Sequence, residues 1–170
     1  MLVLAQCSTG SDARSPVATT PTTVLVVTYG ADPTESAKMV CATDGQQAIK
    51  AALNVSAQQV TTPTWVDHLY SCTYQYATGS FALSVKELPT IAATVDYFTS
   101  LKAKSTTTQP AALGQEGFVT SDNTWIVRKD NKVLDVDVTN LPMQFGEPLR
   151  SRADISQSIA VALLGCWTGD

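Results

Sequence analysis

Residues 70–88, YSCTYQYATGSFALSVKEL, decide the fold of this chain. Over residues 70–76 the tyrosines and one cysteine alternate with Ser, Thr and Gln, which is the period of a β-strand. Residues 77–80, Ala-Thr-Gly-Ser, supply a turn, and over residues 81–88 Phe, Leu and Val alternate with Ala, Ser and Lys. The stretch therefore predicts a β-hairpin with one buried face.

Amphipathic helices are predicted on both sides of this hairpin. Asp44 is expected to cap a helix that ends near Asn54, after a shorter helical turn that begins at Thr34. Pro89 is expected to start the next helix, and Asp154 to cap the last one. The predicted apolar stripes are Ile49 and Leu53 in the first helix, Ile91, Val95, Phe98 and Leu101 in the second, and Ile155, Ile159, Ala162 and Cys166 in the third.

Three further strands are predicted as an antiparallel meander over residues 118–120, 125–128 and 133–139. In the last of them the pattern sends three residues to the core and three to water. The core residues are Leu134, Val136 and Val138, and the water-facing ones are Asp135, Asp137 and Thr139. Residues 24–29 read as a leading strand or an extended arm. The fold predicted is α+β, with an antiparallel sheet of about five strands and amphipathic helices packed on it.

The composition is that of one weakly charged domain. The chain has 170 residues, of which 44% are hydrophobic and 15% charged, against about 25% charged in an average soluble protein. The net charge of −4 and the scattered basic residues argue against a nucleic-acid partner. No run of 18 or more apolar residues is present to span a membrane. The domain is expected over residues 24–170.

The N-terminal residues suggest export. Residues 4–7, Leu-Ala-Gln-Cys, resemble the end of a bacterial lipoprotein signal peptide, in which the cysteine is acylated. On this interpretation residues 1–7 are the remnant of a signal peptide, Cys7 carries lipid, and the Ser-, Thr- and Pro-rich residues 8–23 form a flexible tether at the outer face of the cell membrane. The alternative is an ordinary N-terminal tail with an exposed cysteine.

The remaining cysteines are Cys41, Cys72 and Cys166, so one of them has no partner if Cys7 is acylated. An oxidising compartment favours a disulfide, for which we prefer Cys41 with Cys72 and keep Cys72 with Cys166 as the competitor. Cys166 lies on a predicted apolar stripe, so we expect either a buried thiol or half of a disulfide.

Few residues point to catalysis. His68 is the only histidine, and it is interpreted as a loop residue rather than as a general base. Asp135 and Asp137 share a strand face as metal-binding carboxylates would, but solvated strand residues are the preferred interpretation. No metal site is predicted, since a single histidine excludes a multi-histidine site. No cofactor is predicted either, and phosphate loops, dinucleotide fingerprints and hydrolase elbows are all absent from the sequence.

An unusual set of aromatic residues surrounds the hairpin. Core packing against a helix explains most of them, and a ligand groove lined by aromatics with polar tips is the functional alternative. The candidate groove residues are Trp65, Tyr70, Tyr74, Tyr76 and Phe98.

Four segments carry a family resemblance. They are Cys41 before an Ala-rich helix, Ser71-Cys-Thr-Tyr74, Pro110-Ala-Ala-Leu-Gly-Gln-Glu-Gly-Phe118, and Arg152-Ala-Asp-Ile with Gly165-Cys-Trp167. Across residues 35–167 the chain resembles actinobacterial cell-envelope lipoproteins of unknown function, some of which have a PsbP-like α+β sandwich. The resemblance implies that fold and an envelope location, and it assigns no catalytic residue.

The function predicted is therefore a non-enzymatic binding module, anchored to the membrane by lipid, that holds an envelope lipid, a small apolar ligand or a partner protein. A small envelope hydrolase and a structural subunit of an envelope complex are the alternatives.

Overall fold

The computed structural model describes residues 30–106 and 108–167. The expectations for Cys7, for residues 8–23 and for residues 24–29 lie outside these residues. The helices of the described part are α1 (Glu35–Met39), α2 (Thr43–Leu53), α3 (Ile91–Lys104) and α4 (Arg152–Cys166). Its strands are β1 (Gln59–Val60), β2 (Thr64–Val66), β3 (Leu69–Tyr76), β4 (Gly79–Glu87), β5 (Thr108–Ala111), β6 (Glu116–Thr120), β7 (Trp125–Lys129), β8 (Lys132–Asp137), β9 (Gln144–Phe145) and β10 (Arg150–Ser151).

Eight of these strands form one antiparallel sheet, in the order β1-β3-β4-β8-β7-β6-β5, with β2 paired beside β1 along β3. β9 and β10 form a separate two-stranded ribbon. The predicted α+β class and antiparallel pairing are confirmed, but the number of strands is larger than the five expected. The strands that were missed are short, and most lie at the edges of the sheet or in the ribbon.

The hairpin that decided the prediction is the centre of the observed fold. β3 and β4 pair over their whole length, from Leu69 opposite Lys86 to Tyr76 opposite Gly79, and β8 continues the sheet beyond β4. Alternation then separates two faces of the sheet. We call the face with the larger cluster of buried residues the large-core face, and the opposite one the α3 face.

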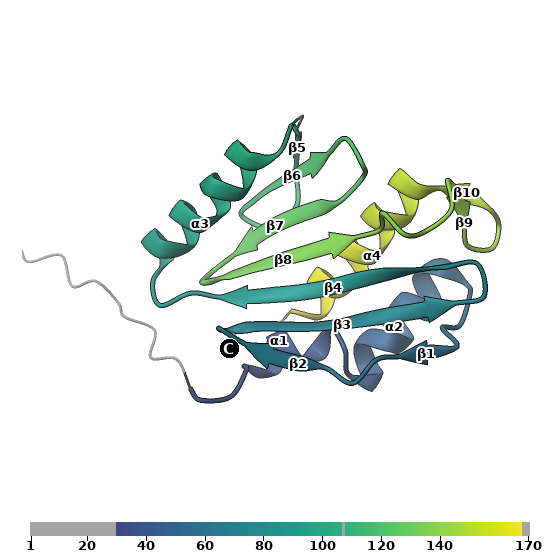
Figure 1. Ribbon diagram of the computed structural model, residues 1–170, viewed down its shortest axis with the longest axis horizontal. Coiled ribbons are helices and arrows are strands. Elements are labelled where there is room, and N and C mark those ends of the chain that lie inside the picture. Colours follow the sequence, from purple (N-terminus) through teal and green to yellow (C-terminus); the bar gives the residue numbers. More distant parts are fainter. Residues whose placement is uncertain (1–29, 107, 168–170) are drawn as a thin grey trace, which may run out of the picture.

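The large-core face is covered by α1, α2 and α4, which lie behind the sheet in Figure 1. Its strand residues include Cys72, Tyr74, Phe81, Leu83, Val85, Leu134 and Val136, each at most 5% exposed. The α3 face has a small cluster in which Phe98 of α3 packs on Phe118, Ile126 and Val133.

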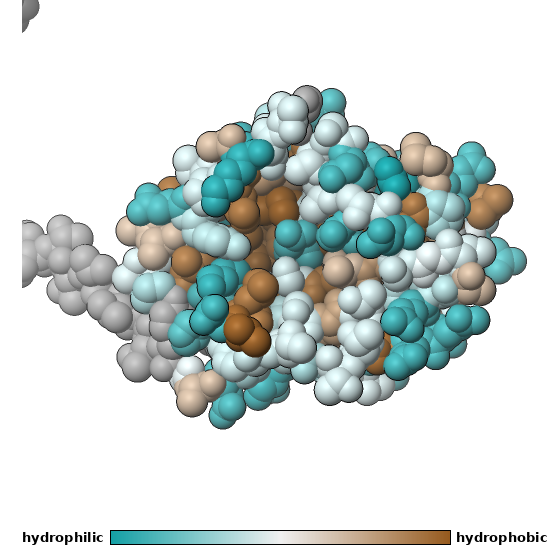
Figure 2. Space-filling view, viewed as in Figure 1, coloured by the Kyte–Doolittle hydropathy of each residue, from teal (hydrophilic) through white to brown (hydrophobic). Residues whose placement is uncertain are grey.

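Most of the α3 face over β3 and β4 carries small or polar residues. Ser71, Thr73, Ala82 and Ser84 lie there half-buried. Figure 2 shows this side of the molecule as pale, weakly polar surface, with an apolar recess beside α3. Only part of this face is therefore covered by a helix.

The disulfide between Cys41 and Cys72 is confirmed, with the Cα atoms 6.0 Å apart. It joins the junction of α1 and α2 to the middle of β3. The competing pair, Cys72 with Cys166, is wrong, because the Cys166 thiol is free and exposed at the end of α4. The expectation of a buried or bonded Cys166 is corrected accordingly.

Helix α4 is rotated relative to the predicted stripe. Ile155 and Ile159 are buried as expected, but the rest of the buried face is formed by Ser156, Ala160 and Leu163. α4 packs against both α2 and the sheet, so small residues are buried where helices approach closely. This rotation leaves Cys166 in solvent.

The predicted helix caps also need correction. Ser151, rather than Asp154, is the N-cap of α4, and its Oγ accepts a hydrogen bond from the Asp154 backbone N–H at 3.1 Å. α2 begins after Ala42 with no side-chain cap, so Asp44 lies in its first turn instead. Its end at Asn54, in the left-handed region, is as predicted.

Helix α3 buries a narrower face than predicted. Phe98 and Thr94 are buried, whereas Ile91 and Val95 are 47% and 37% exposed. α3 packs on the sheet through Phe98, whose ring meets that of Phe118 on β6 at a centroid distance of 5.1 Å, while the outer part of the predicted stripe remains in water.

Asp135 lies on the predicted face of β8, but its surroundings differ from those predicted. It does point to the α3 face, but its Oδ1 is buried and has no hydrogen-bond partner. Burial, with smaller contributions from the neighbouring carboxylates of Asp137 and Asp122, raises the pKa of this carboxyl to about 7. The prediction that Asp135 faces water is wrong.

Candidate functional site

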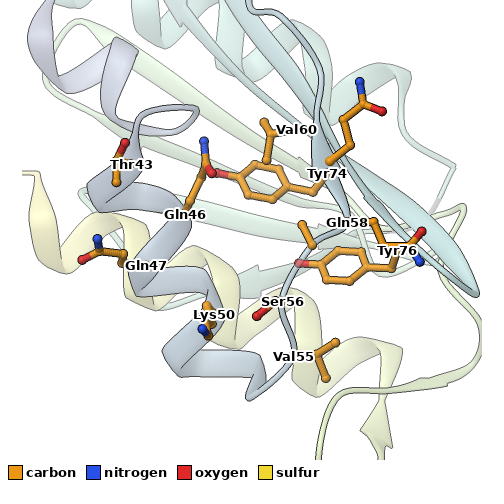
Figure 3. A pocket seen from close by; sticks show the side chains of 12 residues that line it. Thr43, Gln46, Gln47, Lys50, Val55, Ser56, Gln58, Val60, Tyr74 and Tyr76 are labelled. Carbon is orange, nitrogen blue, oxygen red and sulfur yellow. The ribbon is translucent and has the colours of Figure 1, made fainter.

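A groove opens between α2 and the sheet edge formed by β1 and β3. It is a cavity of about 280 Å³, and the loop of residues 55–58 closes one side of it. Figure 3 shows α2 on one wall, with Tyr74 and Tyr76 of β3 facing it across the groove. The groove exists because the Cys41–Cys72 disulfide fixes the start of α2 beside β3 while the polar face of α2 turns outward.

Tyr74 forms the rigid part of the floor. Its ring stacks on Phe81 with the centroids 4.8 Å apart, and its hydroxyl donates a hydrogen bond to the Val40 carbonyl at 2.7 Å. Burial raises the pKa of Tyr74 well above its usual value. Tyr74 therefore supplies an apolar ring edge, since its hydroxyl is already bonded.

Tyr76 differs from Tyr74 in the hydrogen bonding of its hydroxyl group. Its ring is held between Phe81 and Phe145, with centroids 5.7 Å and 4.9 Å away. Within residues 30–106 and 108–167 its hydroxyl makes no hydrogen bond. Burial raises the pKa of Tyr76 to about 12, so the hydroxyl stays protonated at neutral pH. It is therefore a neutral donor and acceptor available to a ligand.

The helical wall carries uncharged hydrogen-bonding groups and one cation. Thr43, Gln46, Gln47 and Lys50 recur at helical spacing and line one side of the groove. The Gln46 side-chain amide donates to the Cys41 carbonyl at 2.9 Å, which fixes its orientation. Gln47 and Lys50 are exposed and make no hydrogen bond or ion pair within the described part of the chain.

A second cavity, of about 550 Å³, adjoins the first. The two share Val55, Ser56, Gln58 and Tyr76, so Tyr76 lies where they meet. The outer wall of the second cavity comes from the ribbon region and is mainly apolar. Its apolar residues there are Pro142, Phe145 and Leu149.

The ribbon is held against α2 by a close backbone approach. Gly146 has a φ of +88°, and a Cβ at this position would lie 3.0 Å from Ile155 and 3.2 Å from the Leu53 carbonyl. The next residue, Glu147, donates its backbone N–H to the same carbonyl at 2.9 Å. Glycine is therefore required for the ribbon to form the wall of the second cavity.

Of the five aromatic residues predicted for a groove, Tyr74 and Tyr76 line the first cavity. Tyr70 and Trp65 lie farther along β3 and β2 as a cross-strand pair, and the Trp65 indole donates to the Ala31 carbonyl at 3.0 Å. Phe98 lies on the opposite face of the sheet. The structure therefore brings two of the five together.

The other candidate residues lie apart from the groove. His68 occupies the turn between β2 and β3 with a φ of 57°, and its ring meets Trp65 edge-on at 5.4 Å. Asp135 and Asp137 lie on the α3 face. Among the described residues, no cluster of three or more His, Cys, Asp or Glu side chains is arranged to hold a metal ion.

Sequence reasoning missed the two walls of the groove. The signal for the first was present, because Thr43, Gln46, Gln47 and Lys50 form a polar face opposite the stripe of α2. The signal for Phe145 and Leu149 was not, since the ribbon that presents them is made of strands two residues long.

Compared with protein-family models, with curated proteins and with solved structures, the chain matches none. Kinship with envelope lipoproteins and a PsbP-like architecture thus stay predictions. In the part of the chain that the structure describes, no helix has the length and apolar character of a membrane span.

Proposed function

We propose that this protein is a non-enzymatic binding module whose joined cavities hold a small uncharged molecule with one polar and one apolar end. The observation that carries the proposal is the meeting of the two cavities at Tyr76. On one side lie amide and hydroxyl groups of α2 and residues 55–58, and on the other lie the apolar side chains of the ribbon.

The charge of the lining supports an uncharged ligand. Among the described residues that line the two cavities, Lys50 alone carries a charge, and it is exposed at the rim. Small-molecule sites are usually apolar with a few placed polar groups, which is the pattern found here. A monoacylglycerol has the required chemistry, with hydroxyl groups for Gln47 and Tyr76 and a chain for Leu149.

One feature supports a location outside the cell. The buried Cys41–Cys72 disulfide is the kind of bond that persists in oxidising compartments. The proposed acylation of Cys7, followed by the tether of residues 8–23, would hold the binding domain at the outer face of the membrane. A PsbP-like sandwich is part of the same proposal. Intact mass of the native protein, with fractionation of the cells, tests the anchor: an unmodified N-terminal peptide in the soluble fraction would overturn it.

Titration with monolaurin below its micellar concentration, followed by calorimetry, tests the binding site. We expect saturable binding, and about tenfold weaker binding for Leu149→Ser because an apolar contact with the chain is lost. Val161→Ser is the matched control, since Val161 is also an exposed apolar residue, on α4. Tyr76→Phe should weaken binding about threefold through the lost hydrogen bond.

Two results would overturn this proposal. One is that neither a heat of binding nor a change in the mass of the native protein is seen with monolaurin, lauryl alcohol or glycerol. The other is binding that Leu149→Ser and Val161→Ser reduce equally, since that would indicate a site elsewhere.

A further inference from the structure

A third cavity lies at the other end of the large-core face and shares no residue with the first two. It has a volume of about 350 Å³ and is bounded by the start of α4 and by β5, β6 and β7. The order of strands places these three at the opposite edge of the sheet from β1. A ligand here would be independent of the groove at Tyr76.

Trp125 on β7 is the aromatic wall of this cavity. Its side chain is 9% exposed, and its indole N–H donates to no acceptor within residues 30–106 and 108–167. The other two indoles are both bonded, Trp65 to the Ala31 carbonyl at 3.0 Å and Trp167 to the Ser36 carbonyl at 2.6 Å. Trp125 is thus the indole of the described chain whose donor is left for a ligand or water.

Three amide side chains surround the same space, from three different elements. Gln109 comes from β5, Asn123 from the turn between β6 and β7, and Gln157 from α4. None of the three side chains makes a hydrogen bond within the described part of the chain. Each amide presents both a donor and an acceptor, which is the pairing that a sugar hydroxyl needs.

The negative charge on the wall of this cavity restricts which ligands it can bind. Among the described residues that line this cavity, Asp154 alone carries a charge, and one of its carboxylate oxygens accepts a hydrogen bond from the Ser151 hydroxyl at 2.6 Å. A carboxylate with no cation beside it disfavours phosphates and other anions. It can, however, accept hydrogen bonds from hydroxyl groups.

We propose that this cavity binds a neutral carbohydrate of one or two sugar rings. The indole N–H, the three amides and the Asp154 carboxylate supply donors and acceptors around one ring-sized space, and Trp125 with Val119 supplies its apolar side. The volume lies in the range usual for small-molecule sites.

The three indoles provide the test. In ¹H–¹⁵N spectra of the ¹⁵N-labelled protein, the indole signal of Trp125 should shift saturably during titration with at least one of glucose, galactose, N-acetylglucosamine, maltose and cellobiose. The signals of Trp65 and Trp167 should stay in place, because their N–H groups are already bonded inside the protein. Trp125→Phe assigns the signal.

Gln157→Ala should weaken binding of the same sugar about fivefold, as expected for the loss of one hydrogen bond. Gln75→Ala is the matched control, an exposed glutamine on β3 that lines none of the three cavities. Because Gln157 is exposed, its replacement leaves the fold intact. No shift with any of the five sugars up to about 50 mM, a range that detects millimolar affinity, would overturn the proposal. Equal weakening by the two variants would do so as well. Monolaurin should leave the Trp125 signal unmoved, so this proposal and the lipid proposal fail separately.

Discussion

The two faces of the sheet differ in how they are stabilised. Among the described residues, the large-core face and its three helices share a cluster of 23 buried residues, whereas the α3 face and its one helix share a cluster of four. All three cavities described above lie beside the large-core face, at the margins of its helical cover. The comparison teaches that cavities in this fold arise where a well-packed layer ends. The sparsely covered face instead tolerates polar groups such as Asp135.

Truncation of one phenylalanine on each face tests most directly whether the two faces differ in stability. Phe81→Ala is expected to lower the free energy of unfolding by about 4 kcal/mol, because Tyr74 and Tyr76 hold the space around Phe81 open after truncation. Phe118→Ala should cost less, about 3 kcal/mol, since α3 alone covers that site and can move inward. Urea denaturation measures both.

Val66→Ala serves as the control for this pair, because Val66 is 64% exposed and its truncation should change stability by less than about 0.5 kcal/mol. An equal loss for Phe81→Ala and Phe118→Ala would show that the two faces are equally rigid.

The disulfide should contribute the next largest effect on the large-core face. It closes a loop with a sequence separation of 31, for which the chain-entropy relation gives about 3.7 kcal/mol of stabilisation. The double variant Cys41→Ser and Cys72→Ser should unfold at correspondingly lower urea concentration. Cys166→Ser is the control, since that thiol is free and exposed. A double variant as stable as the parent would contradict the prediction.

The buried carboxyl of Asp135 should make the stability of the protein depend on pH, which tests the α3 face separately. Its folded pKa, about 7, lies above the value near 4 of an unfolded carboxyl, so the folded state holds the proton more tightly between these values. Stability should therefore fall as pH rises from about 4 to about 7. Asp135→Asn cannot ionise, and at pH 8 it should exceed the parent in stability by about 2 kcal/mol, with little difference at pH 4.

Thermal unfolding of both proteins between these pH values measures the effect. Asp137→Asn is the comparison variant, because Asp137 lies two residues along the same strand face and contributes to the raised pKa of Asp135. Its effect should be smaller. A parent protein that gains stability between pH 4 and pH 7 at this site, relative to Asp135→Asn, would reverse the predicted sign.

The smallest expected effect concerns the cap of α3. The Thr90 hydroxyl accepts a hydrogen bond from the Ala93 backbone N–H at 3.0 Å, and Thr90→Ala should cost about 1 kcal/mol. Thr99→Ala, at an exposed position within the same helix, should be neutral or slightly stabilising. Hydrogen exchange should accelerate in α3 and remain unchanged in α4. Acceleration in both helices would indicate that the two faces open together.

The sequence predicted the parts of the fold whose signal is local. The hairpin of residues 70–88 has strict alternation, and both its pairing and its buried face are as predicted. The cysteine pair was not local in this sense: Cys41 with Cys72 was the preferred of two open pairings, and only the folded chain decides between them. The end of α2 at Asn54 was as local as the hairpin, since it depends on one residue in the left-handed region.

The predictions that were wrong share one cause, which is that burial at these positions depends on tertiary packing. Ser156 and Ala160 are buried in α4 because α2 approaches them closely, which no single-helix pattern contains. The burial of Asp135 likewise depends on α3 reaching over β8. As for the candidate site, Tyr76 was predictable from its strand. The polar face of α2 was visible in the sequence, but its position opposite Tyr76 and beside the ribbon was not, because these parts come together only in the folded chain.

The contacts of Trp167 have a consequence for the order in which the segments of the protein pack during synthesis. The Trp167 indole is bonded to a carbonyl 131 residues earlier, at Ser36, and its own carbonyl accepts a hydrogen bond from the Lys129 ammonium. Arg150 similarly reaches back to Ala52, 98 residues before it. Helix α4 is the last segment of the described chain to leave the ribosome, and until it is present the large-core face of β7 and β8 has no helix over it. We expect the nascent chain to expose that apolar layer from the synthesis of β7 and β8 until α4 follows, so the large-core face closes late, when α4 and Trp167 reach the residues near Ser36.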